Sequence, residues 1–274
     1  MTEVTARAST VIPIVERSMA ANRPIFLWGP PGIGKSELVA SITDNLPGNN
    51  LMIDLRLALM EPTDLRGYPF RNPENNTMEW SPPVDLPSQE LASQYDTIVL
   101  FLDELNSAPP SVQAASYQLI LNGKIGQYLL PNNVRIVAAG NRETDRGVTF
   151  RMPAPLANRF RHINMEVNFE DWQQWAVNND IHSEVVGYLS YAKQDLFDFD
   201  PKTSSQSFAT PRSWSRAAIA ATTLRMYHQL RRAMNAVDLR PATARPRHAL
   251  KATCHSHFWV TVARDVSTLH PKNL

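Results

Sequence analysis

Cysteine, long apolar stretches and an excess of one charge are all scarce in this sequence. Its 274 residues include one cysteine, Cys254, which excludes a disulfide within the chain. No apolar run approaches the roughly 20 residues that a membrane-spanning helix requires. The first residues, MTEVTARASTVIP, also lack the basic start and apolar stretch of a secretory signal. We therefore expect a cytoplasmic protein that has no membrane contact.

The charges nearly cancel, with 27 Lys and Arg against 26 Asp and Glu, but they are unevenly distributed. Residues 1–224 contain 18 basic and 24 acidic residues, whereas residues 225–274 contain 9 and 2. Nucleic-acid binding depends on neutralising phosphates, so the acidic body argues against nucleic acid as the main partner without excluding it. The change near residue 225 predicts a boundary between this body and a basic tail.

Short apolar segments alternate with segments of helical periodicity over the first 167 residues. Apolar runs predict buried strands, and apolar positions spaced three or four apart predict helices. The predicted strands are 24–28, 51–55, 97–104, 134–141 and 162–167, and the predicted helices are 35–46 and 110–123, the latter ended by Gly123. This alternation predicts an α/β domain with a parallel sheet.

Beyond residue 167 the apolar runs give way to helical patterns. Segments 168–180 and 182–194 place apolar residues at helical spacing, and segment 210–224 opens with the signals of a helix start. Asn168 and Thr210 stand where N-caps are expected, and Pro211 takes the first helical position of the last segment. We therefore predict a small second domain made of helices.

The residues GPPGIGKS (29–36) follow the first predicted strand and open the first predicted helix. They match G-x-x-x-x-G-K-[ST], in which glycines let backbone N–H groups converge on phosphate oxygens and the helix N-terminus favours negative charge. In this motif the lysine reaches the β- and γ-phosphates and the hydroxyl holds Mg²⁺. The sequence predicts a nucleotide site made by Gly29, Pro30, Pro31, Gly32, Ile33, Gly34, Lys35, Ser36 and Glu37.

Polar residues end two further predicted strands. Asp103 and Glu104 end the run IVLFLDE, and Asn141 ends the run VRIVAAGN. A phosphate loop needs a neighbouring carboxylate for Mg²⁺, which Asp103 would provide together with Ser36. Glu104 would act as the general base for the attacking water. Because parallel strands end at one crevice, Asn141 would orient that water or contact the γ-phosphate.

The order of the segments GPPGIGKS, LFLDE (100–104), AAGN (138–141), ANRF (157–160) and TPR (210–212) resembles an AAA+ ATPase. Two longer segments, 53–69 and 123–141, look like the MoxR-like branch, which is grouped with dynein-related ATPases. The resemblance covers roughly residues 10–220. It implies a P-loop NTPase fold, an αβα sandwich with a parallel sheet over 1–166, followed by an all-α lid over 167–225.

The resemblance also implies roles for individual residues. Gly29–Ser36 would be Walker A, Asp103 and Glu104 would be Walker B, and Asn141 would be sensor 1. Arg159 would be the arginine finger that acts on a neighbour's nucleotide, with Arg161 or Arg146 as alternatives, and Arg212 would be sensor 2. Such proteins usually bind ATP and Mg²⁺, form hexameric rings and remodel or activate another protein, often one with a von Willebrand factor A-domain.

The tail, 226–274, is atypical of that family. It could be a basic arm for a partner or nucleic acid, a variable extension, or the product of a shifted reading frame. Cys254, His255 and His257 are a weak signal for a metal site, because no fourth ligand is in view, and we expect none there.

Two other functions remain open from the sequence. A nucleic-acid-associated NTPase motor would use the basic tail, and an assembly module would bind nucleotide without useful hydrolysis. The intact Glu104 argues against the second, and the motif itself does not separate ATP from GTP.

Overall fold

The computed structural model describes residues 4–145, 149–199, 208–220 and 222. The chain divides into two compact units, Met1–Asn168 and Phe169–Leu274, which we call unit 1 and unit 2. The basic tail, Cys254 and Arg146 lie outside the described residues. Within the described residues, no helix has the length and apolar character that crossing a membrane requires.

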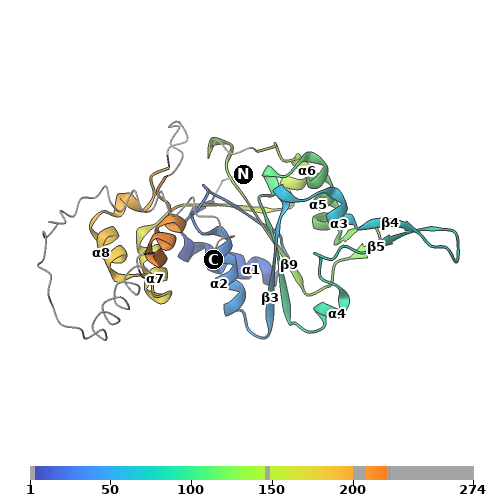
Figure 1. The fold of residues 1–274 in the computed structure, drawn as a ribbon, viewed down its shortest axis with the longest axis horizontal. Helices are drawn as coiled ribbons and strands as arrows, with labels where there is room; N and C mark the ends of the chain where they lie inside the picture. Colours follow the sequence, from blue (N-terminus) through green and yellow to red (C-terminus); the bar gives the residue numbers. More distant parts are fainter. Residues whose placement is uncertain (1–3, 146–148, 200–207, 221, 223–274) are drawn as a thin grey trace, which may run out of the picture. The chain divides into compact units, whose positions relative to one another are not determined.

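A parallel six-stranded sheet forms the centre of unit 1 (Figure 1). Its strands are ordered β1-β10-β2-β9-β6-β3, and every neighbouring pair is parallel. Their bounds are β1 Val4–Ala6, β2 Ile25–Trp28, β3 Asn50–Arg56, β6 Thr97–Asp103, β9 Val134–Gly140 and β10 Arg161–Met165. Because all these strands run in the same direction, their carboxyl ends lie along one edge of the sheet.

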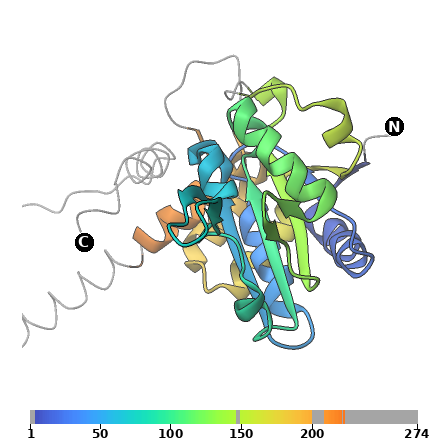
Figure 2. The ribbon, with the colours of Figure 1, turned by 90° about the vertical axis from the view of Figure 1, so that its right-hand side faces the viewer.

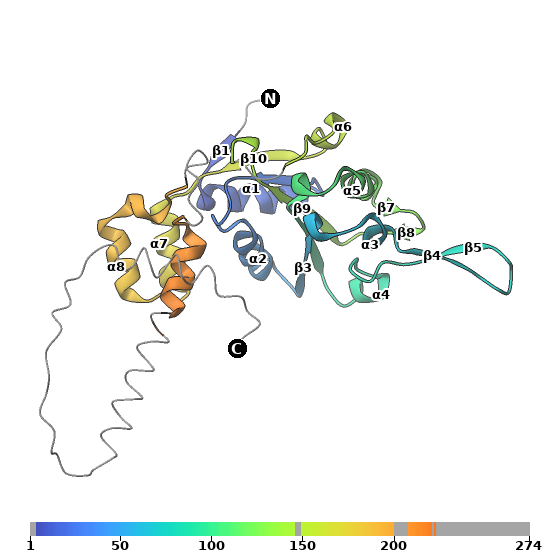
Figure 3. The same ribbon diagram turned by 45° about the horizontal axis from the view of Figure 1, so that its top comes forward.

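Helices cover both faces of this sheet. Figures 1 and 3 show α1 and α2 on one side of the strands and α5 on the other, and Figure 2 shows α5 lying across the strands. The helices of unit 1 are α1 Ala8–Ala20, α2 Lys35–Asn45, α3 Pro62–Arg66, α4 Gln89–Ala92, α5 Pro110–Asn122 and α6 Ala154–Ala157, with 3-10 turns Leu57–Leu59, Leu105–Ser107 and Glu143–Asp145. The architecture is a three-layer α/β fold.

The side chains of the central strands alternate between two apolar cores. Ile25 and Leu27 of β2 pack with residues of α1 and α2, whereas Phe26 packs with residues of α5 on the opposite face. All three are fully buried. Strands that are covered on both faces consist of nearly continuous apolar residues, which is why the run IFLW is so apolar.

Two small antiparallel hairpins extend this framework. Strands β4 Tyr68–Arg71 and β5 Met78–Ser81 form a hairpin that projects from unit 1 (Figures 1 and 3). Strands β7 Lys124–Ile125 and β8 Tyr128–Leu129 form the second, between α5 and β9. The first hairpin exposes Tyr68, Phe70 and Met78 to 59, 46 and 64%.

The described part of unit 2 is helical. It contains α7 Phe169–Asn178, α8 Ser183–Tyr191, the 3-10 turn Lys193–Leu196 and a helix over 211–220. Trp214 is 1% exposed, and its indole donates to the Asp195 carbonyl at 2.8 Å. The hydroxyl of Thr210 accepts from the Ser213 amide at 3.1 Å, so Thr210 caps the last helix as the sequence predicts.

The predicted strands and long helices of unit 1 are present, with ends that differ by one or two residues. Gly123 has φ of +61° and ends α5 as predicted. Sequence reasoning did not find β1 and α1, because Pro13 lies inside α1 and β1 has only three residues. It also did not find the β4–β5 hairpin, whose strands have only four residues each and so give too short a pattern to read.

Candidate active site

The loop between β2 and α2 forms a candidate phosphate cradle. Gly34 is the N-cap residue of α2 and has φ of +95°, which glycine adopts without strain. A Cβ built on Gly34 would meet no atom within 4 Å, so the backbone of the loop is open to close approach. The N-terminus of α2 adds backbone donors that have no partner within the helix. The loop therefore fits a phosphate group.

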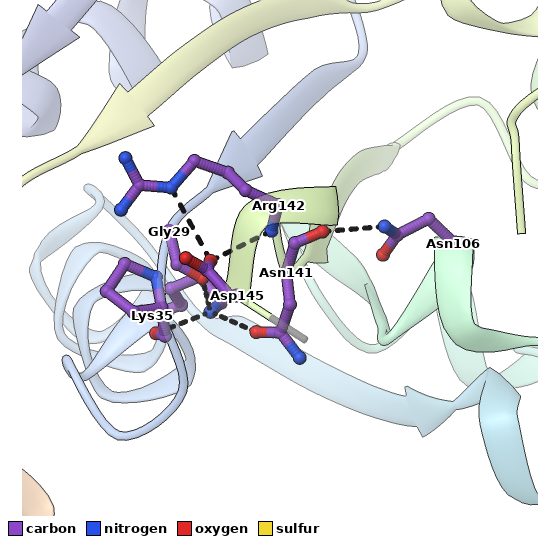
Figure 4. Close-up of polar contacts among 7 residues, drawn as sticks. Gly29, Lys35, Asn106, Asn141, Arg142 and Asp145 are labelled. Carbon is purple, nitrogen blue, oxygen red and sulfur yellow. Dashed lines mark hydrogen bonds and ion pairs between the residues drawn. The ribbon is translucent and has the colours of Figure 1, made fainter. Parts of the chain in front are cut away.

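Lys35 connects this loop to the end of β9. Its ammonium group donates to the Gly29 carbonyl at 2.7 Å, the Pro30 carbonyl at 3.1 Å and Asn141 Oδ1 at 3.1 Å (Figure 4). The residue is only 9% exposed. The Gly29 amide in turn donates to the Gly140 carbonyl at 3.3 Å. The predicted P-loop lysine and the predicted sensor residue are thus in direct contact.

The two acids lie where β6 ends. Asp103 is the last residue of β6, and its Oδ1 accepts from the Glu104 amide at 2.9 Å. Glu104 has φ of +56°, a left-handed conformation that is uncommon for a residue with a side chain. Amides of Ser107 and Ala108 bond to the Glu104 carbonyl at 2.9 and 3.1 Å and hold this conformation. Backbone strain of this kind concentrates at functional sites.

Asp54 of the neighbouring strand β3 is a carboxylate that sequence reasoning missed. Its pKa is raised, first by burial and second by the negative charge of Asp103, while the positive charge of Arg56 opposes the shift. In the parallel pairing, Arg56 lies opposite Asp103 and Asp54 two residues earlier. The end of the sheet that follows β3 and β6 is therefore rich in negative charge, which suits a cation.

Asn106 is a second residue that sequence reasoning missed. It is 2% exposed, and its Nδ2 donates to the Asn141 carbonyl at 2.7 Å (Figure 4). The Asn106 carbonyl accepts from the Phe150 amide at 2.7 Å. A Cβ on Gly140 would clash with the Asn106 side chain and would come within 2.8 Å of Phe26 Cζ. Asn106 thus packs directly over the end of β9, and no sequence signal other than its position after Glu104 marks it.

Arg142, the residue after Asn141, is held by a local acid. The Arg142 amide and Nε both point to Asp145 Oδ2, at 3.0 and 3.5 Å (Figure 4). The Asp145 side chain is 7% exposed and the Arg142 side chain 42%. This pair fixes the turn that follows Asn141.

Arg159 and Arg161 do not lie at this edge of the sheet. Arg159 and Arg161 are exposed and precede or begin β10, whose first residue pairs with Ile25, the first residue of β2. They therefore lie at the amino-terminal edge of the sheet, opposite the P-loop. Arg212 is exposed in the helix 211–220 of unit 2. The alternative finger, Arg146, lies outside the described residues.

The donor groups at the site fit Mg²⁺. Ser36 is the second residue of α2 and Asp103 ends β6, so a hydroxyl and a carboxylate are supplied from the predicted elements. Hard oxygen ligands of this kind suit Mg²⁺, which takes one or two protein ligands and completes its shell with water and phosphate. Within the described residues there is no group of three or more His, Cys, Asp or Glu that could hold a metal by itself. A magnesium ion here would therefore depend on nucleotide phosphates.

Comparison with known proteins agrees with this arrangement. The family model described as an AAA domain of the dynein-related subfamily matches residues 24–160. Midasin of Giardia intestinalis is 27% identical over 193 residues, which cover 66% of this chain and 4% of Midasin. The chain thus spans a small part of that relative.

Similar solved structures include NtrX of Brucella abortus and a RuvB mutant of Thermotoga maritima. NtrX has a TM-score of 0.44 and 14% identity over 78% of this chain and 50% of its own. The RuvB structure has a TM-score of 0.44 and 18% identity over 80% and 63%. The match over residues 24–160, half of the chain, includes the P-loop, Asp103, Glu104, Asn141 and Arg159. This chain belongs to the AAA domain family, in its dynein-related subfamily.

Proposed function

We propose that this chain hydrolyses ATP between the subunits of a ring and uses the energy to remodel or activate another protein. The observation that carries the proposal is the contact between Lys35 and Asn141 at the carboxyl edge of the sheet. It joins the phosphate loop to the strand end beside which Asp103 and Glu104 also lie. A cradle, a magnesium ligand and a base at one edge are the parts that phosphoryl transfer to water needs.

The chemistry assigns one task to each group. Lys35 would exchange a carbonyl contact for the β- and γ-phosphate oxygens, because an ammonium group pairs more strongly with an anion than with a carbonyl. Ser36 and Asp103 would hold Mg²⁺, which when bound neutralises charge on the phosphates. Glu104 would accept a proton from water as the water oxygen attacks the γ-phosphorus and ADP leaves. Asn141 would position that water or the γ-phosphate.

The location of Arg159 supports catalysis between subunits. Gly29, at the carboxyl edge, is six positions along the chain from Arg23, at the amino-terminal edge. At about 3.3 Å per residue along a strand, the two edges are roughly 20 Å apart. Arg159 lies at the first edge, so it would serve the nucleotide of a neighbouring subunit and not its own. Arg212 would contact the nucleotide from the lid.

The β4–β5 hairpin supports a protein partner. Its exposed Tyr68, Phe70 and Met78 offer an apolar surface of the kind that marks protein contacts. Its charges, Arg71 with Glu74 and Glu79, are mixed, so the hairpin has no basic surface for nucleic acid. We propose a MoxR-like role on a folded partner, with a von Willebrand factor A-domain as the partner to test first.

The test is the ATPase rate per subunit at increasing protein concentration, for wild type, Glu104→Gln and Arg159→Ala. We expect the wild-type rate per subunit to rise with concentration, because the shared site forms on assembly. Both variants should still bind ATP but should hydrolyse it much more slowly. For Arg159→Ala we expect kcat to fall by about 10³-fold or more. A wild-type rate that is flat in concentration, together with an active Arg159→Ala, would refute shared catalysis. Binding of ATP by wild type without turnover would instead favour an assembly module.

DNA offers a direct test of the alternative partner. The same assay with added double-stranded DNA at low and high salt should show no stimulation. Stimulation that falls with salt would favour a nucleic-acid-associated motor over a protein partner.

A further inference from the structure

A polar cavity opens at the amino-terminal edge of the unit 1 sheet, opposite the P-loop. It has a volume of about 600 Å³ and is lined by residues before β2, around the end of α5, before and within β9, and before β10. Arg23 and Arg159 both line it, together with four asparagines, Asn22, Asn122, Asn132 and Asn158. None of its 15 lining residues is acidic.

Both arginines lack a carboxylate partner among the described residues. Other charged residues, such as Arg142 with Asp145 and Lys193 with Glu170, form ion pairs. Arg23 and Arg159 are both exposed. Two guanidinium groups that share a cavity without an acid repel each other, and an anion in the cavity would relieve this repulsion. The cavity therefore has the charge of an anion site.

The backbone around Arg23 and Arg159 is held rigidly. Asn22 lies two residues beyond the end of α1 and has φ of +51°. The amides of Asn22 and Arg23 donate to the Met19 and Ser18 carbonyls at 3.0 and 2.8 Å. These two bonds form a Schellman motif, which fixes the backbone position of Arg23. The Arg161 amide donates to the Pro24 carbonyl at 2.9 Å and ties the segment of Arg159 to that of Arg23. The two arginines thus stand on backbone segments that are tied to each other.

The site at the carboxyl edge has little positive charge of its own. Lys35 is the cation of the phosphate loop, Arg142 is paired with Asp145, and Arg56 lies opposite Asp103 beside Asp54. Asp54, Asp103 and Glu104 add negative charge to the same edge. Charge that develops on the transferred phosphoryl group needs cations near it. Arg23 and Arg159 lie at the opposite edge, so they can contribute to this charge only at the site of another subunit.

We propose that Arg23 acts with Arg159 as a second cation on the nucleotide of the neighbouring subunit, and that this cavity receives the triphosphate end of that nucleotide. The proposal rests on the proposed function, since it requires that the site be shared between two copies. The anion that we expect in the cavity is a phosphate chain and not an acidic segment of another protein.

The first measurement is the ATPase rate of Arg23→Ala at saturating ATP and at protein concentrations where the wild-type rate per subunit no longer rises. We expect kcat to fall about 10- to 100-fold, which is less than for the arginine finger. Arg23→Lys should recover part of this loss because it keeps the charge. Arg17→Ala is the matched control, since Arg17 is exposed in the last turn of α1 and does not line the cavity. A kcat for Arg23→Ala equal to that of Arg17→Ala would overturn the proposal.

Mixing variants separates a role in a neighbour's site from a structural role. Lys35→Ala subunits lack the phosphate-loop cation but keep both arginines, whereas Arg23→Ala subunits keep the loop. An equal mixture of the two variants should be more active than either alone, because some interfaces then combine an intact loop with intact arginines. The mixture of Arg159→Ala with Lys35→Ala gives the reference value for the recovery of ATPase activity.

Recovery in the reference mixture without recovery for Arg23→Ala would overturn the role of Arg23 and leave the proposed function standing. Recovery in neither mixture would refute shared catalysis itself. A return of the Arg23→Ala rate to the wild-type value at high protein concentration would show that Arg23 serves assembly alone, and would also overturn the proposal.

Discussion

Replacing Asn106 by alanine tests whether the buried amide holds the end of β9 in its catalytic position. Asn106 Nδ2 donates to the Asn141 carbonyl at 2.7 Å, and Asn141 Oδ1 lies 3.1 Å from Lys35 Nζ. Loss of the first bond removes the support of the second. The hydrogen bonds run from the segment after β6, through the end of β9, to the phosphate loop.

The expected change in the free energy of unfolding follows from the two polar atoms of the Asn106 side chain, Nδ2 and Oδ1. Removing the donor leaves the Asn141 carbonyl without this bond, at a cost of about 1–3 kcal/mol. Asn106 Oδ1 is buried and has no hydrogen-bond partner among the described residues, so its removal offsets part of that cost. We expect Asn106→Ala to lower the free energy of unfolding by about 1–2 kcal/mol. A shift of Asn141 by about 1 Å would lower kcat by up to 100-fold.

Asn133→Ala is the matched control. Asn133 Nδ2 donates to the carbonyls of Ala92 and Tyr95, both at 2.8 Å, just before β9 begins. Asn133 is less buried than Asn106 but donates two such bonds against one, so its loss should again cost about 1–2 kcal/mol without changing kcat. The assays are urea unfolding and ATPase kinetics at saturating ATP. A wild-type kcat for Asn106→Ala, at a stability equal to that of Asn133→Ala, would refute the positioning role. Asn106→Asp keeps the shape and loses the donor, so it should also lose kcat.

Three further predictions concern single residues. Gly140→Ala should lower the free energy of unfolding by about 1–3 kcal/mol, because its Cβ would press on Asn106 and Phe26; an unchanged urea midpoint would contradict the close packing. Lys35→Met should weaken ATP binding at least tenfold, since a hydrogen bond to a charged group contributes about 1.5–3 kcal/mol. An ATP affinity equal to that of wild type in calorimetric titration would contradict this role of Lys35. The hydrogen bond to Asp195, with burial second, raises the pKa of Tyr188 to about 12 from 10.0. The folded state thus favours the neutral phenol, and its stabilisation is full below pH 10 and lost as the pH rises to about 12. The stability difference between wild type and Tyr188→Phe should therefore be constant below pH 10 and should close above it, and a difference independent of pH would contradict this assignment.

The sequence by itself determined the elements that carry local signals. Runs such as IFLW and TIVLFLD are apolar on both faces, so they indicate strands covered by helices on both sides. The P-loop could be identified because its glycines and Lys35 are consecutive residues whose spacing is set by the phosphate that they bind. Gly123 and Thr210 could be identified as helix ends because capping depends on the nearest few residues. For the same reason, Asp103, Glu104 and Asn141 could be selected as residues that follow apolar runs.

The tertiary structure alone decided how these elements meet. The order of the strands brings Asn141 against Lys35, 106 residues earlier, because β9 lies beside β2 in the sheet. It also places Asn106 over Gly140 and Arg23 in the same cavity as Arg159. No local pattern marks Asn106 or Arg23, since the contacts that matter join residues far apart in the chain. Packing of parallel strands and the helices that cover them, and not the spacing of residues along the sequence, decides which polar groups share a site.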